Sequence, residues 1–208
     1  MAENHEQESL AADHEVAPDE EEVQRVEPEL DPETRARRAA ALAQVRKFGD
    51  PVLQGRALTV ERFDDALRAE VGRMVEIMGD GLGIGLAATQ LGLMNRVLVY
   101  RLGADAPVAA LVNPEVEWRG HEQETLEEGC LSLPGVHVDV ERSVYVRVRA
   151  HDEGGSELVI EATGLEARVI QHEIDHLDGV LILDRTTKEA RKEAIRALRE
   201  MERDEEAA

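Results

Sequence analysis

The stretch of this chain that decides its fold is Gln171-His172-Glu173-Ile174-Asp175-His176-Leu177-Asp178-Gly179. His172 and His176 are four residues apart, so on a helix both imidazoles lie on one face, where they can bind the same metal ion. Glu173 follows the first histidine, at a position from which a general base reaches a water molecule that a metal has activated. The alternative is an amphipathic helix with two hydrogen-bonded core histidines, but the spacing favours a metal-dependent hydrolase.

The helix that carries these histidines is expected over Leu165–Asp178. Ile170, Ile174 and Leu177 form one apolar stripe, and the histidines belong to the stripe beside it. A helix that is apolar most of the way round is buried. We therefore expect this helix in the middle of the domain, with sheet packed around it.

The strands of this sheet precede the helix in the sequence. Ser143–His151 alternates between apolar and polar side chains, and a turn leads to a return strand over Glu157–Ala162. Further upstream we expect strands at Val97–Arg101 and Ala109–Val112, the second of which ends at Asn113-Pro114. The predicted fold class is α+β, with mixed or antiparallel sheets packed around a central metal-binding helix.

Further helices are expected before and after these elements. Leu67, Val71 and Met74 share one face of a helix predicted over Asp64–Met78. A surface helix is predicted near the C-terminus, over Lys188–Arg203.

A catalytic metal needs a third protein ligand, which leaves the fourth position for water. Upstream, Cys130 is the one cysteine of the chain, and alternating apolar residues follow it, so it can point inward from a strand. Downstream, no histidine follows His176, and Glu193 and Glu200 lie on the charged surface helix. We favour Cys130, although a lone buried cysteine is more often a small hydrophobic residue.

The segment Gly83-Ile84-Gly85-Leu86-Ala87-Ala88-Thr89-Gln90 is rich in small residues. Glycine lets another backbone come close, which suits a substrate strand that pairs beside Ile84 and Gly85. Gln90 ends the run and is either an inward-pointing amide or a surface glutamine. The segment lacks the glycine spacing and the Lys-Ser/Thr pair of a phosphate loop, so phosphate binding is disfavoured.

Composition excludes several classes of function. The chain carries a net charge of −21, and residues 1–30 hold eleven acidic side chains and one basic one, so DNA binding is not expected. No apolar run approaches the roughly 20 residues that a membrane span needs. One cysteine excludes an intramolecular disulfide and fits a reducing cytoplasm. We expect residues 1–40 to form a disordered acidic extension.

Three motifs now stand in a fixed order: Gly83–Gln90, Glu128–Ser132 (Glu-Gly-Cys-Leu-Ser) and Gln171–Gly179. They resemble the signature motifs of the peptide deformylase family, and Lys47–Leu53 resembles the usual opening of that family. The resemblance covers roughly residues 43–186. It implies a catalytic domain over 41–186, followed by a helix and short tail over 187–208. It also implies an enzyme that removes the formyl group from N-formyl-methionine on newly synthesised polypeptides and releases formate.

The resemblance further implies a metal centre. Cys130, His172 and His176 would bind one divalent ion, natively Fe²⁺ in this family, with Zn²⁺, Ni²⁺ or Co²⁺ as substitutes. Glu173 would be the general acid/base. Asp175 would either orient a ligand histidine or be an exposed helix acid.

The oxyanion hole and substrate contacts follow from the same resemblance. The side chain of Gln90 and the backbone N–H of Leu131 would bind the oxyanion. Gly85, with Ile84 before it, would lie beside the substrate backbone.

Predictions about partners complete the hypothesis. The substrate would be a nascent N-formyl-methionyl polypeptide, and we expect a cytoplasmic monomer. The C-terminal helix carries a basic ridge that fits ribosomal RNA near the exit tunnel, although interleaved glutamates fit ordinary helix ion pairs. The ridge consists of Lys188, Lys192, Arg196 and Arg199.

Two other functions stay open at this point. One is a zinc endopeptidase with Glu193 or Glu200 as the third ligand. The other is a non-catalytic metal-binding module, which would require a fourth protein ligand.

Overall fold

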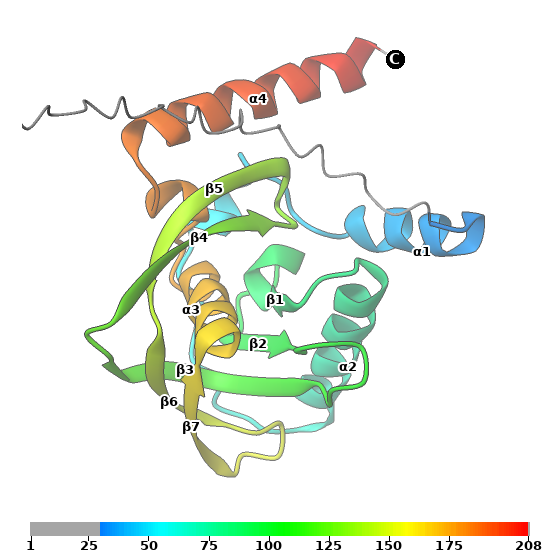
Figure 1. Ribbon diagram of the computed structural model, residues 1–208. Helices are drawn as coiled ribbons and strands as arrows, with labels where there is room; N and C mark the ends of the chain where they lie inside the picture. Colours follow the sequence, from blue (N-terminus) through cyan, green and yellow to red (C-terminus); the bar gives the residue numbers. More distant parts are fainter. Residues whose placement is uncertain (1–29, 208) are drawn as a thin grey trace, which may run out of the picture. The chain divides into compact units, whose positions relative to one another are not determined.

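The computed structural model describes residues 30–207, and these form two antiparallel sheets with helices around and between them (Figure 1). The predicted disordered extension over residues 1–40 lies mostly outside the described residues, but its last part is wrong, because residues 32–42 form a helix whose N-terminus is capped by the Asp31 carboxylate. The helices are α1 (Pro32–Leu42), η1 (Pro51–Gln54), α2 (Asp65–Asp80), η2 (Ala88–Leu91), α3 (Gly164–Leu177), η3 (Ile182–Asp184) and α4 (Lys188–Ala207). The strands are β1 (Gly85–Ala87), β2 (Val97–Tyr100), β3 (Ala109–Arg119), β4 (Gln123–Cys130), β5 (Leu133–Ser143), β6 (Tyr145–His151) and β7 (Glu157–Thr163).

The larger sheet has the strand order β1-β2-β3-β6-β7, and every neighbouring pair is antiparallel. The second sheet is the hairpin of β4 and β5. Helix α3 packs against strands of both sheets, and Figure 1 shows it between them. The predicted fold class, with sheet packed around a central helix, is confirmed.

Helix α3 is buried over most of its length, from Ala167 to Leu177, because it packs between the two sheets. Ile170 and Leu177 have no exposed surface, and they pack with residues of β2, β3, β6 and β7. The helix is followed by Gly179, whose φ of +75° favours glycine. A Cβ at Gly179 would meet the backbone of Gln54, so this turn holds α3 close against η1.

Helix α2 packs against β1 and β2, and it confirms the helix predicted over Asp64–Met78, although it continues to Asp80. Its N-terminus is capped by Asp64, whose carboxylate accepts hydrogen bonds from the backbone N–H groups of Ala66 and Leu67. Its buried face packs against β1 and β2, and consists of Leu67, Val71, Met74, Ile77 and Met78.

The predicted end of β3 at Asn113-Pro114 is wrong, because the strand continues to Arg119. A β-bulge between Val112 and Glu115 accommodates the proline, which cannot donate to the ladder. Asn113 adopts φ +54° at the bulge. Its side-chain Oδ1 accepts a hydrogen bond from the Val60 N–H, and its Nδ2 donates to the Val60 carbonyl, so the amide bonds Val60 as a neighbouring strand would.

Helix α4 lies against β5 and η3 through Ala194 and Leu198, which pack with Leu133 and Val138. The predicted C-terminal surface helix is confirmed. None of the helices in residues 30–207 combines the length and the hydropathy that crossing a bilayer requires.

Candidate metal centre

The structure brings Cys130, His172 and His176 together at one point between α3 and the end of β4. The two histidines share a face of α3, and Cys130 is the last residue of β4. The Cys130 Sγ lies 3.2 Å from the His176 Nε2, which lies 3.2 Å from the His172 Nε2. All three donor atoms lie within 4.8 Å of one another.

This donor set fits a metal ion. Ligands around a tetrahedral ion with bonds near 2.0–2.3 Å are separated by about 3.3–3.8 Å. The two short separations at the His176 Nε2 are close to this spacing. Imidazole and thiolate are also the donors that bind Fe²⁺ and Zn²⁺. Among the residues that the structure describes, no other group of three or more His, Cys, Asp or Glu side chains is placed to hold an ion.

The charges of the centre are strongly coupled. Burial raises the pKa of the Cys130 thiol, but His176 and His172 beside it outweigh this effect and hold that pKa well below its usual range. Burial lowers the pKa of His172, but hydrogen bonds to Cys130 and Glu128 dominate and raise it to about 10. A thiolate, which is the form that binds metals, is therefore favoured in this site.

Glu173 lies on α3 next to the first histidine, and its carboxylate is buried. Burial raises its pKa above the ordinary glutamate value. Its Oε2 has no hydrogen-bond partner among the described residues. A buried carboxylate oxygen without a partner is costly and indicates a functional group. The carboxylate has room because residue 85 is a glycine, since a Cβ there would collide with it.

Gln90 is buried, with its amide beside Cys130, so the surface alternative is wrong. The Gln90 Oε1 accepts a hydrogen bond from the Ala87 N–H at 2.9 Å. The Nε2 donates to Ser132 Oγ at 3.2 Å and lies 3.6 Å from the Cys130 Sγ. The carbonyl group thus orients the amide, and the N–H₂ group faces the centre.

Leu131 follows Cys130, and its carbonyl accepts a hydrogen bond from the Lys47 Nζ at 3.0 Å. Gly85 of β1 pairs with Tyr100 of β2, and Ile84, just before Gly85, is half exposed. β1 is the end strand of the larger sheet.

Sequence reasoning missed the charged side chains behind the centre. Glu128 Oε2 lies 2.9 Å from the His172 Nδ1, and both oxygens of Glu128 accept hydrogen bonds from Arg142. Burial raises the pKa of Glu128, but the bonds to His172 and Arg142 outweigh it and lower that pKa. The position of Glu128 inside the motif around Cys130 was the available signal. No such signal marked Arg142, which stands between Glu141 and Ser143 in the sequence.

Neither hypothesis for Asp175 describes its contacts. Asp175 is buried, so it is not an exposed acid, and its carboxylate bonds Arg142 and Arg185 rather than a histidine. Glu128 is the carboxylate beside a histidine.

The geometry does not support Glu193 or Glu200 as a metal ligand. Both lie exposed on α4, and Glu200 pairs with Arg196 at 3.2 Å. Within residues 30–207 the cluster has three donors, so the fourth protein ligand of a closed structural site is not found there.

Comparison with known proteins identifies the family. The model of the polypeptide deformylase family matches residues 42–192. The chain belongs to the peptide deformylase family. It is 44% identical to a peptide deformylase of Acidothermus cellulolyticus over 162 aligned residues. The alignment covers 78% of this chain and 88% of that protein. It is 49% identical to a peptide deformylase of Thermotoga neapolitana over 142 aligned residues, and this alignment covers 68% of this chain and 85% of that protein.

A solved structure agrees with this membership. The peptide deformylase of Synechococcus elongatus, in complex with actinonin, has a TM-score of 0.71 and 42% identity, and the match covers 74% of this chain and 85% of that one. Peptide deformylases are metal-dependent hydrolases that remove the formyl group from the N-terminus of newly synthesised polypeptides, and this is the activity of the chain.

Proposed function

We propose that Cys130, His172 and His176 hold one divalent ion, natively Fe²⁺, and that Glu173 is the general acid/base of the hydrolysis. The observation that carries this proposal is the convergence of one sulfur and two imidazole nitrogens next to a buried carboxylate that has a free oxygen. A thiolate with two imidazoles suits Fe²⁺ as well as Zn²⁺. The bound ion would polarise the formyl oxygen and make a water molecule acidic enough to attack near neutral pH.

Glu173 moves the proton in this proposal. Its carboxylate takes a proton from the attacking water and passes it to the leaving amine as the formyl C–N bond breaks. The products are formate and a free N-terminus. Positioned acid/base catalysis of this kind contributes about 10²–10⁴-fold. The raised pKa of Glu173 supports the role, because it brings the proton affinity of the carboxylate closer to neutral pH.

Gln90 and the backbone N–H of Leu131 would stabilise the oxyanion. Support comes from the Gln90 amide, whose oxygen is held by the Ala87 N–H while its nitrogen faces Cys130. Losing one such donor costs roughly 3–4 kcal/mol of transition-state stabilisation.

The substrate backbone would pair with the free edge of β1. An end strand presents unpaired N–H and C=O groups, to which an extended peptide can add. Gly85 would allow a close approach of the N-formyl-methionyl backbone, and the half-exposed Ile84 would contact its side chains.

The test is release of formate from a formyl-methionyl peptide, with metal analysis of protein prepared without oxygen. Cys130→Ala should lose both the metal and the activity, and Glu173→Ala should keep the metal and lose activity. Glu161→Ala, at an exposed position on β7, is the matched control. Full activity in either site variant would refute its assigned role, and cleavage of unblocked peptides that survives loss of Cys130 would favour an endopeptidase.

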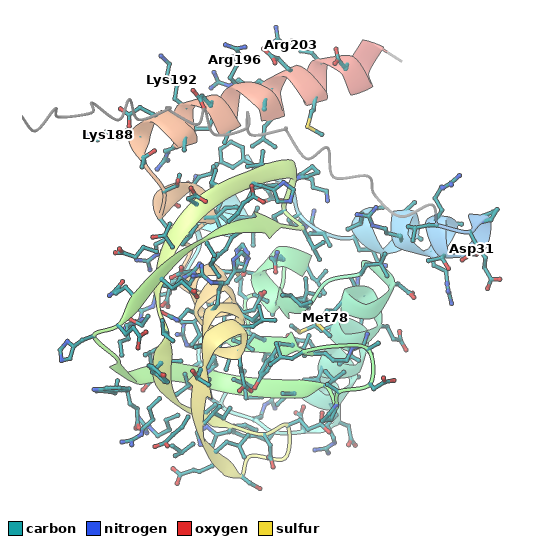
Figure 2. The ribbon with its side chains drawn as sticks, in the orientation of Figure 1. Asp31, Met78, Lys188, Lys192, Arg196 and Arg203 are labelled. Atoms are coloured by element: carbon teal, nitrogen blue, oxygen red, sulfur yellow. The ribbon has the colours of Figure 1, made fainter. Side chains whose placement is uncertain are left out.

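We also propose that the outer face of α4 contacts ribosomal RNA near the exit tunnel. A shallow groove of about 560 Å³ on this helix is lined almost entirely by cations, unusual in a chain of net charge −21. Figure 2 shows Lys192, Arg196 and Arg203 directed away from β5. The lining residues are Lys188, Arg191, Lys192, Ile195, Arg196, Arg199 and Arg203.

Co-sedimentation with ribosomes tests this contact. The variant Lys192→Glu with Arg196→Glu should bind more weakly, and the wild-type affinity should fall steeply with salt. Formate release from a short peptide should not change, because α4 contributes no residue to the metal centre. Equal binding by the variant and by wild type would refute the contact.

We infer that the protein acts as a cytoplasmic monomer whose catalytic domain spans residues 41–186. The single thiol is consistent with a reducing compartment. Sedimentation equilibrium at micromolar concentration should give the mass of one chain.

A further inference from the structure

Three buried charged residues lie behind the metal centre and join two parts of the fold. Arg142 on β5 donates to Glu128 through Nε and Nη2, at 2.7 and 2.9 Å, and to Asp175 Oδ2 through Nη1, at 2.8 Å. All three residues are at most 7% exposed. We name Glu128, Arg142 and Asp175 the arginine bridge.

The two carboxylates of the arginine bridge belong to the two elements that supply the metal donors. Glu128 precedes Cys130 by two residues on β4, and Asp175 immediately precedes His176 on α3. One guanidinium therefore connects the strand that carries the thiol to the helix that carries the imidazoles. Glu128 also lies 2.9 Å from the His172 Nδ1, so it holds this ring with its Nε2 toward the other donors.

We propose that Arg142 is a positioning residue that sets the separation of Cys130 from the two histidines and so determines how long the metal ion is retained. The proposal rests on the metal centre proposed above. Partners behind metal ligands hold the orientation of those ligands, and their loss lowers metal affinity or activity by about 10–100-fold. The planar fork of arginine suits this task because it can bind two carboxylates at fixed angles.

A variant without Arg142 should still fold, because each carboxylate keeps a second arginine. Arg168 donates to Glu128 Oε1 at 2.7 Å, and Arg185 donates to Asp175 Oδ2 at 3.0 Å. Neither Glu128 nor Asp175 is therefore left without a cation. Arg168 also bonds the backbone of β4 and β5, so it preserves the packing of α3 on the hairpin. Among residues 30–207, however, only Arg142 bonds both Glu128 and Asp175, because of these two carboxylates Arg168 bonds Glu128 alone and Arg185 bonds Asp175 alone.

The experiment loads the full chain with Co²⁺ and follows its transfer to an excess of chelator. Arg142→Met and Glu128→Gln should both release the ion about 10–100-fold faster than wild type. Arg142→Lys, which keeps the charge but not the fork, should lie between. Arg147→Met is the matched control, since Arg147 forms an exposed ion pair with Glu161 on β7, and it should release Co²⁺ at the wild-type rate.

A merely structural role would not accelerate metal release in a folded variant, so the unfolding temperature of the metal-free forms is measured in parallel. Wild-type release rates in folded Arg142→Met and Glu128→Gln would overturn the proposal. If Arg142→Met does not fold, Glu128→Gln decides on the same measurement. If the wild-type chain binds no Co²⁺, the metal centre itself is refuted, which distinguishes that failure from failure of the positioning role.

Discussion

The two sides of helix α3 are both largely buried but chemically opposite. Toward the five-stranded sheet it presents Ile170 and Leu177, which pack among apolar side chains. Toward the β4–β5 hairpin it presents His172 and Asp175, which meet Glu128 and Arg142. Apolar burial stabilises a fold in rough proportion to area, whereas buried charges must be paired to be tolerated. The first side therefore determines the stability of the fold, and the second determines the metal centre.

The largest expected effect lies on the charged side. Glu173→Gln keeps the shape of the side chain but removes its ability to accept a proton, so kcat/KM for formate release should fall by about 10²–10⁴-fold. Metal content and thermal stability should be unchanged or slightly improved, because a buried charge is removed. An activity within threefold of wild type would mean that another group moves the proton.

The next effect lies on the apolar side. Ile170→Ala creates a cavity and should lower the free energy of unfolding by about 2–5 kcal/mol, measured by denaturant titration. The protein that remains folded should keep wild-type kcat. The control is Leu165→Ala, at a residue that is 57% exposed, for which little change is expected. A large loss of kcat in folded Ile170→Ala would show that the two sides of α3 are coupled.

A smaller loss of activity is expected where β1 of the larger sheet packs against Glu173 of α3. Gly85→Ala places a methyl group against the Glu173 carboxylate and displaces it, so activity should fall by about 10²-fold. Gly72→Ala on α2 is the control, because its methyl group meets open space and should stabilise the helix by about 0.5–1 kcal/mol. Unaltered activity in Gly85→Ala would contradict the close packing of β1 on Glu173.

The smallest effect concerns charges that are exposed rather than buried. Arg147 and Glu161 form an ion pair at 2.6 Å on the outer side of β6 and β7, half or more exposed. Arg147→Met should change the free energy of unfolding by less than about 1 kcal/mol, and less still at high salt. A loss as large as that of Ile170→Ala would contradict the distinction between buried and exposed pairs.

The sequence predicted the central helix well because a strong local pattern encodes it. Apolar residues at helical spacing and two histidines four residues apart require no knowledge of distant contacts. The β4–β5 hairpin was not predicted as an element. β4 is largely exposed and rich in glutamate, and so lacks the alternation of a half-buried strand, whereas β5 does alternate and carried a signal that was missed. The continuation of β3 past Pro114 depends on the contact between Asn113 and Val60, which is distant in sequence.

In the metal centre, too, local sequence features could be predicted and long-range contacts could not. The motif residues could be named from spacing and resemblance, but their supports could not. Arg142 and Arg185 look like ordinary surface charges in the sequence, and only the tertiary fold brings both to Asp175. Buried ion pairs between separate elements leave no periodic pattern in a single chain.

The most direct test of the metal centre is a titration of the metal-free protein with Co²⁺ while thiolate-to-cobalt absorption and formate release are followed together. Because Cys130 is the single cysteine, any such absorption must come from its sulfur. We predict that absorption and formate release rise in parallel and saturate at one ion per chain. Formate release by the metal-free chain, or activity that saturates without thiolate absorption, would contradict the proposed centre.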